Sequence, residues 1–220
     1  NLMVVNVITR HAPTNYGSLL QAIATQRVIM NLGYECRIIN YIPKCETGVR
    51  MAITQLEQKT KWRRNPIKKA IYLMVAEPET LLMDRKFLAM RKKYLLMGPC
   101  CATTGELKKL YAEKKDEVFL TGSDQVWGPI STGHYDPTYF LDFVPKSSRK
   151  LAFAASFGKA IFDEQTLKEY GVLLKKYDSL AVRENVAVEL LKKMDISAKQ
   201  VLDPTLLMDA DAWSEYVKPM

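Results

Sequence analysis

Short apolar runs alternate with stretches of helical spacing along most of the chain, a pattern typical of a parallel α/β sheet. Residues 3–9 and 36–41 are rich in β-branched and other apolar side chains, which predicts two strands. Between them, a helix is expected over 15–32, capped by Asn15 and ended by Gly33. Its apolar stripe recurs at spacings of three and four and consists of Leu20, Ile23, Ala24 and Val28. Strand, helix and strand in this order form a βαβ unit, so the two strands are expected to be parallel.

The same alternation resumes near residue 118 and continues almost to the end of the chain. Strands are predicted over 118–121, 150–155, 179–183 and 199–202, and helices over 163–176, 185–194 and 211–216. Asp163 and Asn185 stand where the N-cap residues of the first two of these helices are expected. We therefore predict an α/β protein with a Rossmann-like, doubly wound parallel sheet.

Residues 44–115 interrupt the alternation and are predicted to form a mostly helical insertion. Helices are expected over 51–60, 66–75, 78–94 and 105–115, and no strand is evident among them. The segment holds 17 Lys or Arg against 7 Asp or Glu, a net charge of +10, whereas the whole chain carries +8. A solvated helical surface is the commonest meaning of such a segment, but nucleic acid, an anionic membrane surface or a phosphorylated substrate would also suit it. Because no zinc finger, RNP motif or helix-turn-helix accompanies the charge, we expect no nucleic-acid partner, and peripheral contact with a membrane stays open.

The cysteines and histidines form no metal-binding pattern. The chain has four cysteines and two histidines, and no C-x-x-C pair occurs, so no metal is expected. Cys36 lies in a predicted strand and is interpreted as a small core residue. The chain also contains no apolar run of membrane-spanning length and no signal-peptide pattern at its start, which together predict a cytoplasmic protein.

Polar or small residues follow several predicted strands, and in α/β sheets ligands bind outside the carboxyl ends of the strands. After the first strand, Asn15 and Gly17 stand at a helix N-terminus, which favours an anion. Simple capping by Asn15 explains the same residues equally well. Neither a G-x-G-x-x-G nor a Walker A string is present, so the fingerprints of the common dinucleotide and P-loop sites are missing.

The most distinctive string follows the strand over 118–121 and reads Gly122-Ser123-Asp124-Gln125-Val126-Trp127-Gly128. Asp124 could act as a general acid or base or bind a sugar hydroxyl. Ser123 and Gln125 could hydrogen-bond a substrate, and Trp127 could form an apolar wall. The alternative is a turn that Asp124 caps, with Trp127 in the core, and the residues alone leave the two interpretations about equal.

Three further residues complete the candidate set. Ser156 follows the strand over 150–155 among small residues, which let a ligand approach closely. Arg183 ends another strand, where its planar fork suits a phosphate or carboxylate, although a structural pair with an acidic neighbour is nearly as good an explanation. His134 lies in a predicted loop and could donate a proton, but without a visible partner a surface position is favoured.

Taken in order, these strings resemble the polysaccharide pyruvyl transferase family. The matching strings are Asn15-Tyr16-Gly17 with Leu20-Gln21, Gly122-Ser123-Asp124-Gln125-Val126-Trp127, Tyr139-Phe140-Leu141, Phe153-Ala154-Ala155-Ser156-Phe157-Gly158, Val182-Arg183-Glu184 and Val201-Leu202-Asp203-Pro204-Thr205. The second of these is the most specific, and the resemblance spans nearly the whole chain.

The resemblance implies the first lobe of a two-lobed, GT-B-like glycosyltransferase architecture over 1–205, with 206–220 beginning the connection or the second lobe. It also implies an enzyme that moves the pyruvyl group of phosphoenolpyruvate onto two hydroxyls of a sugar in cell-surface polysaccharide synthesis. By the same resemblance the reaction needs no cofactor or metal, and the acceptor is a polysaccharide or a lipid-linked sugar.

Residue by residue, Asp124 and Arg183 then become the catalytic candidates. The candidates for substrate binding are Asn15, Gly17, Ser123, Gln125, Trp127, His134 and Ser156. Two other functions remain open: a glycosyltransferase-like enzyme that uses a nucleotide-sugar donor, and a non-catalytic module that binds a carbohydrate or an anion.

Overall fold

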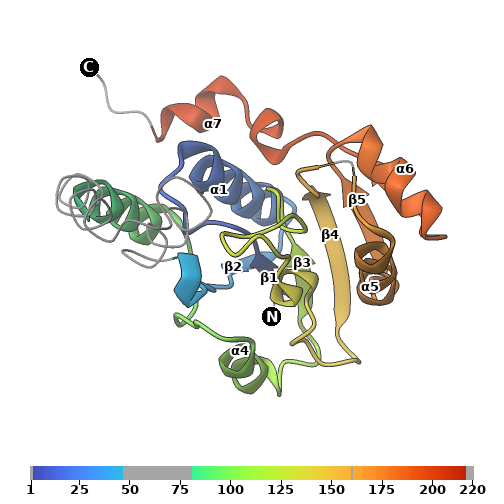
Figure 1. Cartoon of the computed structure of the whole chain (residues 1–220). Coiled ribbons are helices and arrows are strands. Elements are labelled where there is room, and N and C mark those ends of the chain that lie inside the picture. The colour runs from blue at the N-terminus through green and yellow to red at the C-terminus, as the bar shows by residue number, and fades with distance from the viewer. Residues whose placement is uncertain (1, 47–80, 160, 217–220) are drawn as a thin grey trace, which may run out of the picture.

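The computed structural model describes residues 2–46, 81–159 and 161–216, and within them the strands form one six-stranded, all-parallel sheet (Figure 1). The strands lie in the order β2-β1-β3-β4-β5-β6. Their bounds are β1 (Val4–Ile8), β2 (Glu35–Ile38), β3 (Val118–Thr121), β4 (Arg149–Ala155), β5 (Ser179–Val182) and β6 (Lys199–Gln200).

Helices connect most of the strands. The labelled helices are α1 (Tyr16–Asn31), α4 (Thr104–Tyr111), α5 (Glu164–Leu174), α6 (Asn185–Lys193) and α7 (Ala210–Ser214). Residues 81–94 are also helical. Short 3-10 turns occur at η1 (Lys44–Glu46), η2 (Pro137–Phe140) and η3 (Pro204–Leu207).

Two apolar cores lie on the two faces of the sheet, because alternate strand residues point to opposite sides. Val5 and Val7 of β1 join the core under α1, the helical residues 81–94 and α7. Ile8 and Phe119 join the other core, which α4, α5 and α6 cover. The result is the three-layer, doubly wound arrangement that the alternation of strands and helices predicts.

The strand order reverses between β1 and β3, so these neighbours are the topological switch point of the sheet. The chain leaves β1 toward β2 on one side and later returns to β3 on the other side of β1. The connections after β1 and β3 therefore diverge and leave a crevice at the carboxyl edge of the sheet, where ligands bind in such folds.

Most predicted elements are confirmed, and the main differences concern α6, α4 and the insertion. The N-cap of α6 is Glu184, without a side-chain capping bond, and Asn185 is already the first helical residue, so that prediction was wrong. Helix α4 ends at Tyr111, its last buried position, and none of the residues between it and β3 is buried. Single parallel bridges join Ile38 to Met97 and Tyr41 to Cys101, so part of the insertion, which was expected to be mostly helical and without strands, borders the sheet.

Other expectations for the insertion lie outside the described residues. The helices predicted over 51–60 and 66–75 fall there, as do the first residues of the one predicted over 78–94. Asn15 and Asp163 do cap α1 and α5, each accepting a bond from a backbone N–H three residues on. Cys36 is buried in the core as expected.

Candidate active site

A polar pocket of about 240 Å³ lies at the carboxyl edge of the sheet, beside the switch point. Its lining comes from four connections, namely those after β1, β3, β5 and β6. The lining residues are Asn15, Gly17, Ser18, Gln21, Asp124, Arg183, Asp203 and Thr205. The pocket thus brings together four of the residues selected from sequence, including both catalytic candidates.

Asp124 projects a half-buried carboxylate into this pocket and holds it in one orientation. Its Oδ2 accepts a hydrogen bond from Ser18 Oγ at 2.8 Å, and its Oδ1 accepts one from the backbone N–H of Gln125 at 2.7 Å. Its backbone φ is +99°, in the left-handed region that side chains other than glycine rarely adopt. Such strain is common where a side chain is aimed for function.

Asp203 anchors the opposite wall of the pocket through four hydrogen bonds. Its Oδ2 accepts from Ser123 Oγ at 3.0 Å and from Arg183 Nη1 at 2.9 Å. Its Oδ1 accepts from the backbone N–H and the hydroxyl of Thr205 at 2.9 and 2.7 Å. Burial alone would raise the pKa of Asp203, but these four bonds outweigh it and hold that pKa below its ordinary value.

Arg183 is held by two carboxylates but keeps part of its fork free. Its Nε donates to Glu184 and its Nη1 to Asp203, each at 2.9 Å. Burial opposes the charge, yet the two carboxylates together raise the pKa of Arg183 above its ordinary value. Among the described residues no partner is found for Nη2, and Arg183 lines the polar pocket. The structural pairing and the anion-binding interpretation are therefore compatible.

A buried amide forms the base of the pocket. Gln21 Nε2 donates to Thr9 Oγ1 at 2.9 Å and to the backbone oxygen of Ser18 at 2.8 Å. Thr9 in turn donates to the backbone oxygen of Ser123 at 2.5 Å. These bonds tie the chain after β1 to the chain after β3, so the two sides of the crevice are held in register.

Gln125 and Ser156 line a second pocket of about 230 Å³ on the β4 and β5 side of the same edge. The N-terminal turn of α6 and Lys159 also line it. Ser156 is almost fully buried, and its hydroxyl accepts a bond from the backbone N–H of Gly158 at 3.0 Å. Gln125 is exposed, so of these two predicted residues it is the more accessible to a ligand.

Two residues of the distinctive string face the core and not the crevice. Trp127 is 0% exposed and packs against Phe140 and Phe157, with ring centroids 5.8 and 5.1 Å away. It is therefore a core residue, and the prediction of a substrate-facing wall was wrong. Ser123 is also 0% exposed and holds Asp203, so it supports the site without access to a ligand.

The remaining predicted residues divide in the same way. Asn15 and Gly17 are exposed at the start of α1 and line the polar pocket, where Asn15 also caps the helix. His134 is exposed in the loop between β3 and β4 and lines neither of the two pockets. The structure therefore does not bring His134 to the other candidates.

Four lining residues of the polar pocket were not selected from sequence: Ser18, Gln21, Asp203 and Thr205. Asp203-Pro204-Thr205 carried a usable signal, since an Asp followed by Pro after a strand commonly caps a short helical turn. Ser18 lies three residues after the N-cap and so shares its face of α1, but only the fold places that face opposite Asp124.

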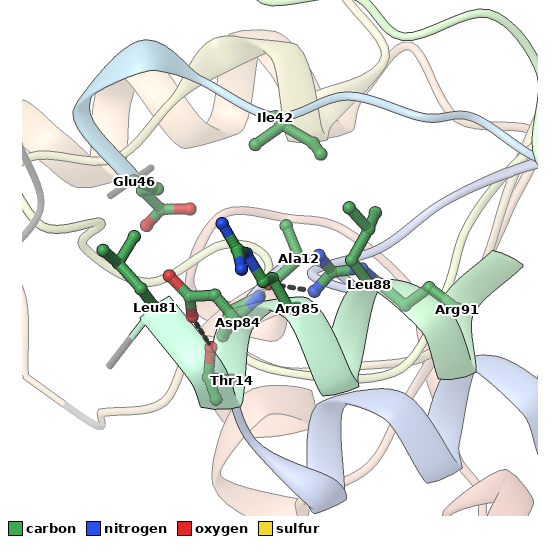
Figure 2. A pocket seen from close by; sticks show the side chains of 10 residues that line it. Ala12, Thr14, Ile42, Glu46, Leu81, Asp84, Arg85, Leu88 and Arg91 are labelled. Carbon is green, nitrogen blue, oxygen red and sulfur yellow. Dashed lines mark hydrogen bonds between the residues drawn. The ribbon is translucent and has the colours of Figure 1, made fainter. Parts of the chain in front are cut away.

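A third pocket, of about 190 Å³, lies on the β1 and β2 side of the same edge, against the helical residues 81–94 (Figure 2). Figure 2 shows Arg85 extending from this helix into a space also bordered by Ile42 and Leu88. Arg91 donates to the backbone oxygen of Ala12, which fixes the loop after β1 to this helix. That loop separates this pocket from the polar one.

No group of three or more His, Cys, Asp or Glu side chains within the described part of the chain is placed to hold a metal ion. Nor does any helix within residues 2–46, 81–159 and 161–216 combine the length and apolar character needed to span a bilayer.

The fold and the pocket together define an α/β protein with a polar ligand crevice at the switch point of a parallel sheet. The family model for polysaccharide pyruvyl transferase matches residues 15–219. The chain therefore belongs to the polysaccharide pyruvyl transferase family, whose name denotes a transferase. The search of curated proteins and the search of solved structures returned no match.

Proposed function

We propose that this protein transfers the pyruvyl group of phosphoenolpyruvate to two hydroxyls of a sugar in a polysaccharide or its lipid-linked precursor. The chain belongs to this family, and the single observation that carries the proposal is that an oriented carboxylate and a guanidinium line the same crevice. Asp124 supplies the carboxylate and Arg183 the guanidinium.

The reaction needs both kinds of group. A proton adds to the methylene carbon of phosphoenolpyruvate, one sugar hydroxyl attacks the carbon that bears the phosphate, and the carbon–oxygen bond to phosphate breaks. The second hydroxyl then attacks the same carbon and closes the cyclic ketal. The two hydroxyl protons balance those taken up by the methylene carbon and by the departing phosphate. Cations are required for the phosphate and carboxylate, and a base for the hydroxyls.

In our proposal Asp124 accepts the proton of the attacking hydroxyl. Its carboxylate is fixed by Ser18 and by the N–H of Gln125, so it presents its remaining lone pairs to the crevice in a set direction. Arg183 contributes Nη2 to an anionic group of the donor, and its two carboxylate partners keep the guanidinium in place. The exposed Gln125 and Lys159 extend the polar surface toward α6.

Replacing Asp124 by asparagine tests this assignment. Asparagine also tolerates positive φ, so the variant should keep the fold while losing the base. We expect the rate of phosphoenolpyruvate-dependent phosphate release with a sugar acceptor to fall by about 10²- to 10⁴-fold. Asp116→Asn, at an exposed position in the turn before β3, is the matched control and should keep full activity. The assay should use the protein encoded by the full reading frame, and equal activity of Asp124→Asn and wild type would refute the assignment.

Ligand-dependent thermal stabilisation separates the competing functions. Phosphoenolpyruvate should raise the melting temperature if the proposal is correct, whereas a nucleoside diphosphate should do so for a nucleotide-sugar enzyme. Stabilisation by sugar alone, with no turnover under any donor, would favour a non-catalytic binding module.

We also propose that the basic segment over 44–115 brings the protein to an anionic membrane surface that carries the lipid-linked acceptor. Its net charge of +10 supports the proposal, since basic segments near a membrane are attracted to anionic lipids. Pelleting with liposomes should then increase with the anionic lipid content and decrease with salt. Pelleting that is insensitive to both would refute it.

A further inference from the structure

A lysine-lined cavity of about 340 Å³ lies at the opposite edge of the sheet from the candidate active site. Its lining residues are Asp142, Val144, Lys146, Lys150 and Lys176. Lys150 is the second residue of β4, so the cavity lies by the amino end of that strand, whereas Asp124 and Ser156 follow the carboxyl ends of β3 and β4. The two sites are therefore separate.

Lys150 is the unusual member of this group. The residue is only 5% exposed, and lysine is almost never buried to that extent without a partner. Among the described residues its Nζ makes neither a hydrogen bond nor an ion pair. The Nζ atom is nevertheless not fully enclosed by protein, so it opens into the cavity that the residue lines.

The nearby carboxylates of Asp142 and Asp178 do not contact the Lys150 ammonium. Asp142 Oδ1 accepts from Lys176 Nζ at 3.0 Å. Asp178 Oδ2 accepts from the backbone N–H of Lys150 at 2.8 Å and acts on its ammonium only at longer range. Three lysines thus line the cavity against one carboxylate, and the most buried of them, Lys150, has no partner among the described residues.

The geometry points to a binding site for a small phosphate monoester, with Lys150 as its central contact and Lys146 and Lys176 at its rim. Phosphate supplies a compact double negative charge and several acceptor oxygens, which suit ammonium groups that act as point charges. The volume lies within the range of small-molecule sites, roughly 300–1,000 Å³, so it holds more than a bare phosphate.

The direction in which the pKa of Lys150 is shifted agrees with an unpaired charge. Burial, followed by repulsion from Lys176, lowers its pKa below the ordinary lysine value despite the two aspartates. A bound dianion would oppose both effects, so ligand binding should raise the pKa of Lys150. This site does not depend on the proposed transferase reaction.

Titration of inorganic phosphate and of glycerol 3-phosphate, at constant ionic strength against chloride, tests the proposal. Both should bind wild-type protein, with the monoester bound more tightly. Lys150→Met keeps the apolar stem and should weaken both affinities at least about tenfold. Lys168→Met, at an exposed position of α5, is the matched control and should bind like wild type. Binding of neither probe, or equal binding by Lys150→Met and wild type, would overturn the proposal.

A second measurement covers the case in which Lys150→Met does not fold. In wild-type protein, glycerol 3-phosphate should slow acylation of Lys150 by an amine-directed reagent, while Lys168 reacts at an unchanged rate. Equal rates for Lys150 with and without the probe would count against the site. Phosphoenolpyruvate binding that is lost in Arg183→Gln but kept in Lys150→Met would assign that ligand to the crevice, so the two proposals fail separately.

Discussion

Asp203 offers the sharpest test of how the candidate site is held together, through the variant Asp203→Ala. Its side chain is 19% exposed and accepts bonds from Ser123, Arg183 and Thr205. Removal leaves the fully buried Ser123 hydroxyl without its acceptor, at a cost of about 1–3 kcal/mol. The lost cap at Thr205 adds about 1 kcal/mol, and the partly exposed Arg183 adds less than that. Because these effects overlap, we expect the free energy of unfolding to fall by about 2–4 kcal/mol.

Urea unfolding at pH 7, followed by tryptophan fluorescence, measures this loss as a lower midpoint at an unchanged slope. Asp203→Asn should lose less stability, because its side-chain oxygen can still accept the bonds from Thr205. Part of the loss should remain, because its NH₂ group then faces the donors Ser123 and Arg183. Asp116→Ala, at an exposed position, should stay within about 0.5 kcal/mol of wild type. A loss for Asp203→Ala no greater than that of Asp116→Ala would refute the description of Asp203 as an anchor.

The pH dependence of this loss provides an independent check. The folded pKa of Asp203 is depressed, so its stabilisation is fully present above the unfolded value of about 3.9 and is lost as the pH falls through the folded value. The difference between wild type and Asp203→Ala should therefore shrink below about pH 4. A difference that stays constant down to pH 2 would contradict the charged pairing.

Three further outcomes are expected from unfolding measurements. Gly128→Ala should cost about 1–3 kcal/mol of stability because its Cβ would lie 2.7 Å from a backbone oxygen. Gly171→Ala, inside α5 with open space around it, should instead stabilise by about 0.5–1 kcal/mol. Equal effects of the two substitutions would contradict the packing. Trp127→Ala should cost about 3–5 kcal/mol, and a loss below 1 kcal/mol would contradict its core position. Burial lowers the pKa of His11, so as the pH falls below about 6.5 the unfolded state takes up more protons than the folded state, and stability should fall. His11→Gln should remove this fall and the exposed His134→Gln should not; the reverse would refute the assignment.

The sheet could be predicted from sequence because its central strands are buried on both faces. Such strands appear as short continuous apolar runs, and the predicted bounds of the strand over 118–121 match β3. The edge strand β6 has only two residues, both exposed, so its apolar signal is weak and the predicted range 199–202 was too long. The loss of signal follows directly from the loss of burial.

The site could be predicted as a set of loops but not as a set of side chains. Asn15, Asp124 and Arg183 come from connections distant in the chain, and parallel pairing brings their strand ends to one edge. The direction of each side chain depends on the path of the loop, which apolar periodicity does not encode. Ser123 and Trp127 were therefore selected with their neighbours although they point inward.

The backbone of Asp124 explains this division within one short string. At φ +99° Asp124 still forms a parallel bridge to Ala155, and Ser123 stays buried while the carboxylate of Asp124 meets Ser18 on α1. This backbone conformation is held because the backbone oxygen of Asp124 accepts bonds from the N–H groups of Val126 and Ser156, at 2.8 and 3.1 Å. Glycine would adopt this φ without strain, whereas an aspartate held there carries a cost of about 1–3 kcal/mol. The carboxylate occupies the crevice despite that cost, and this supports a chemical function for Asp124 over that of a simple turn cap.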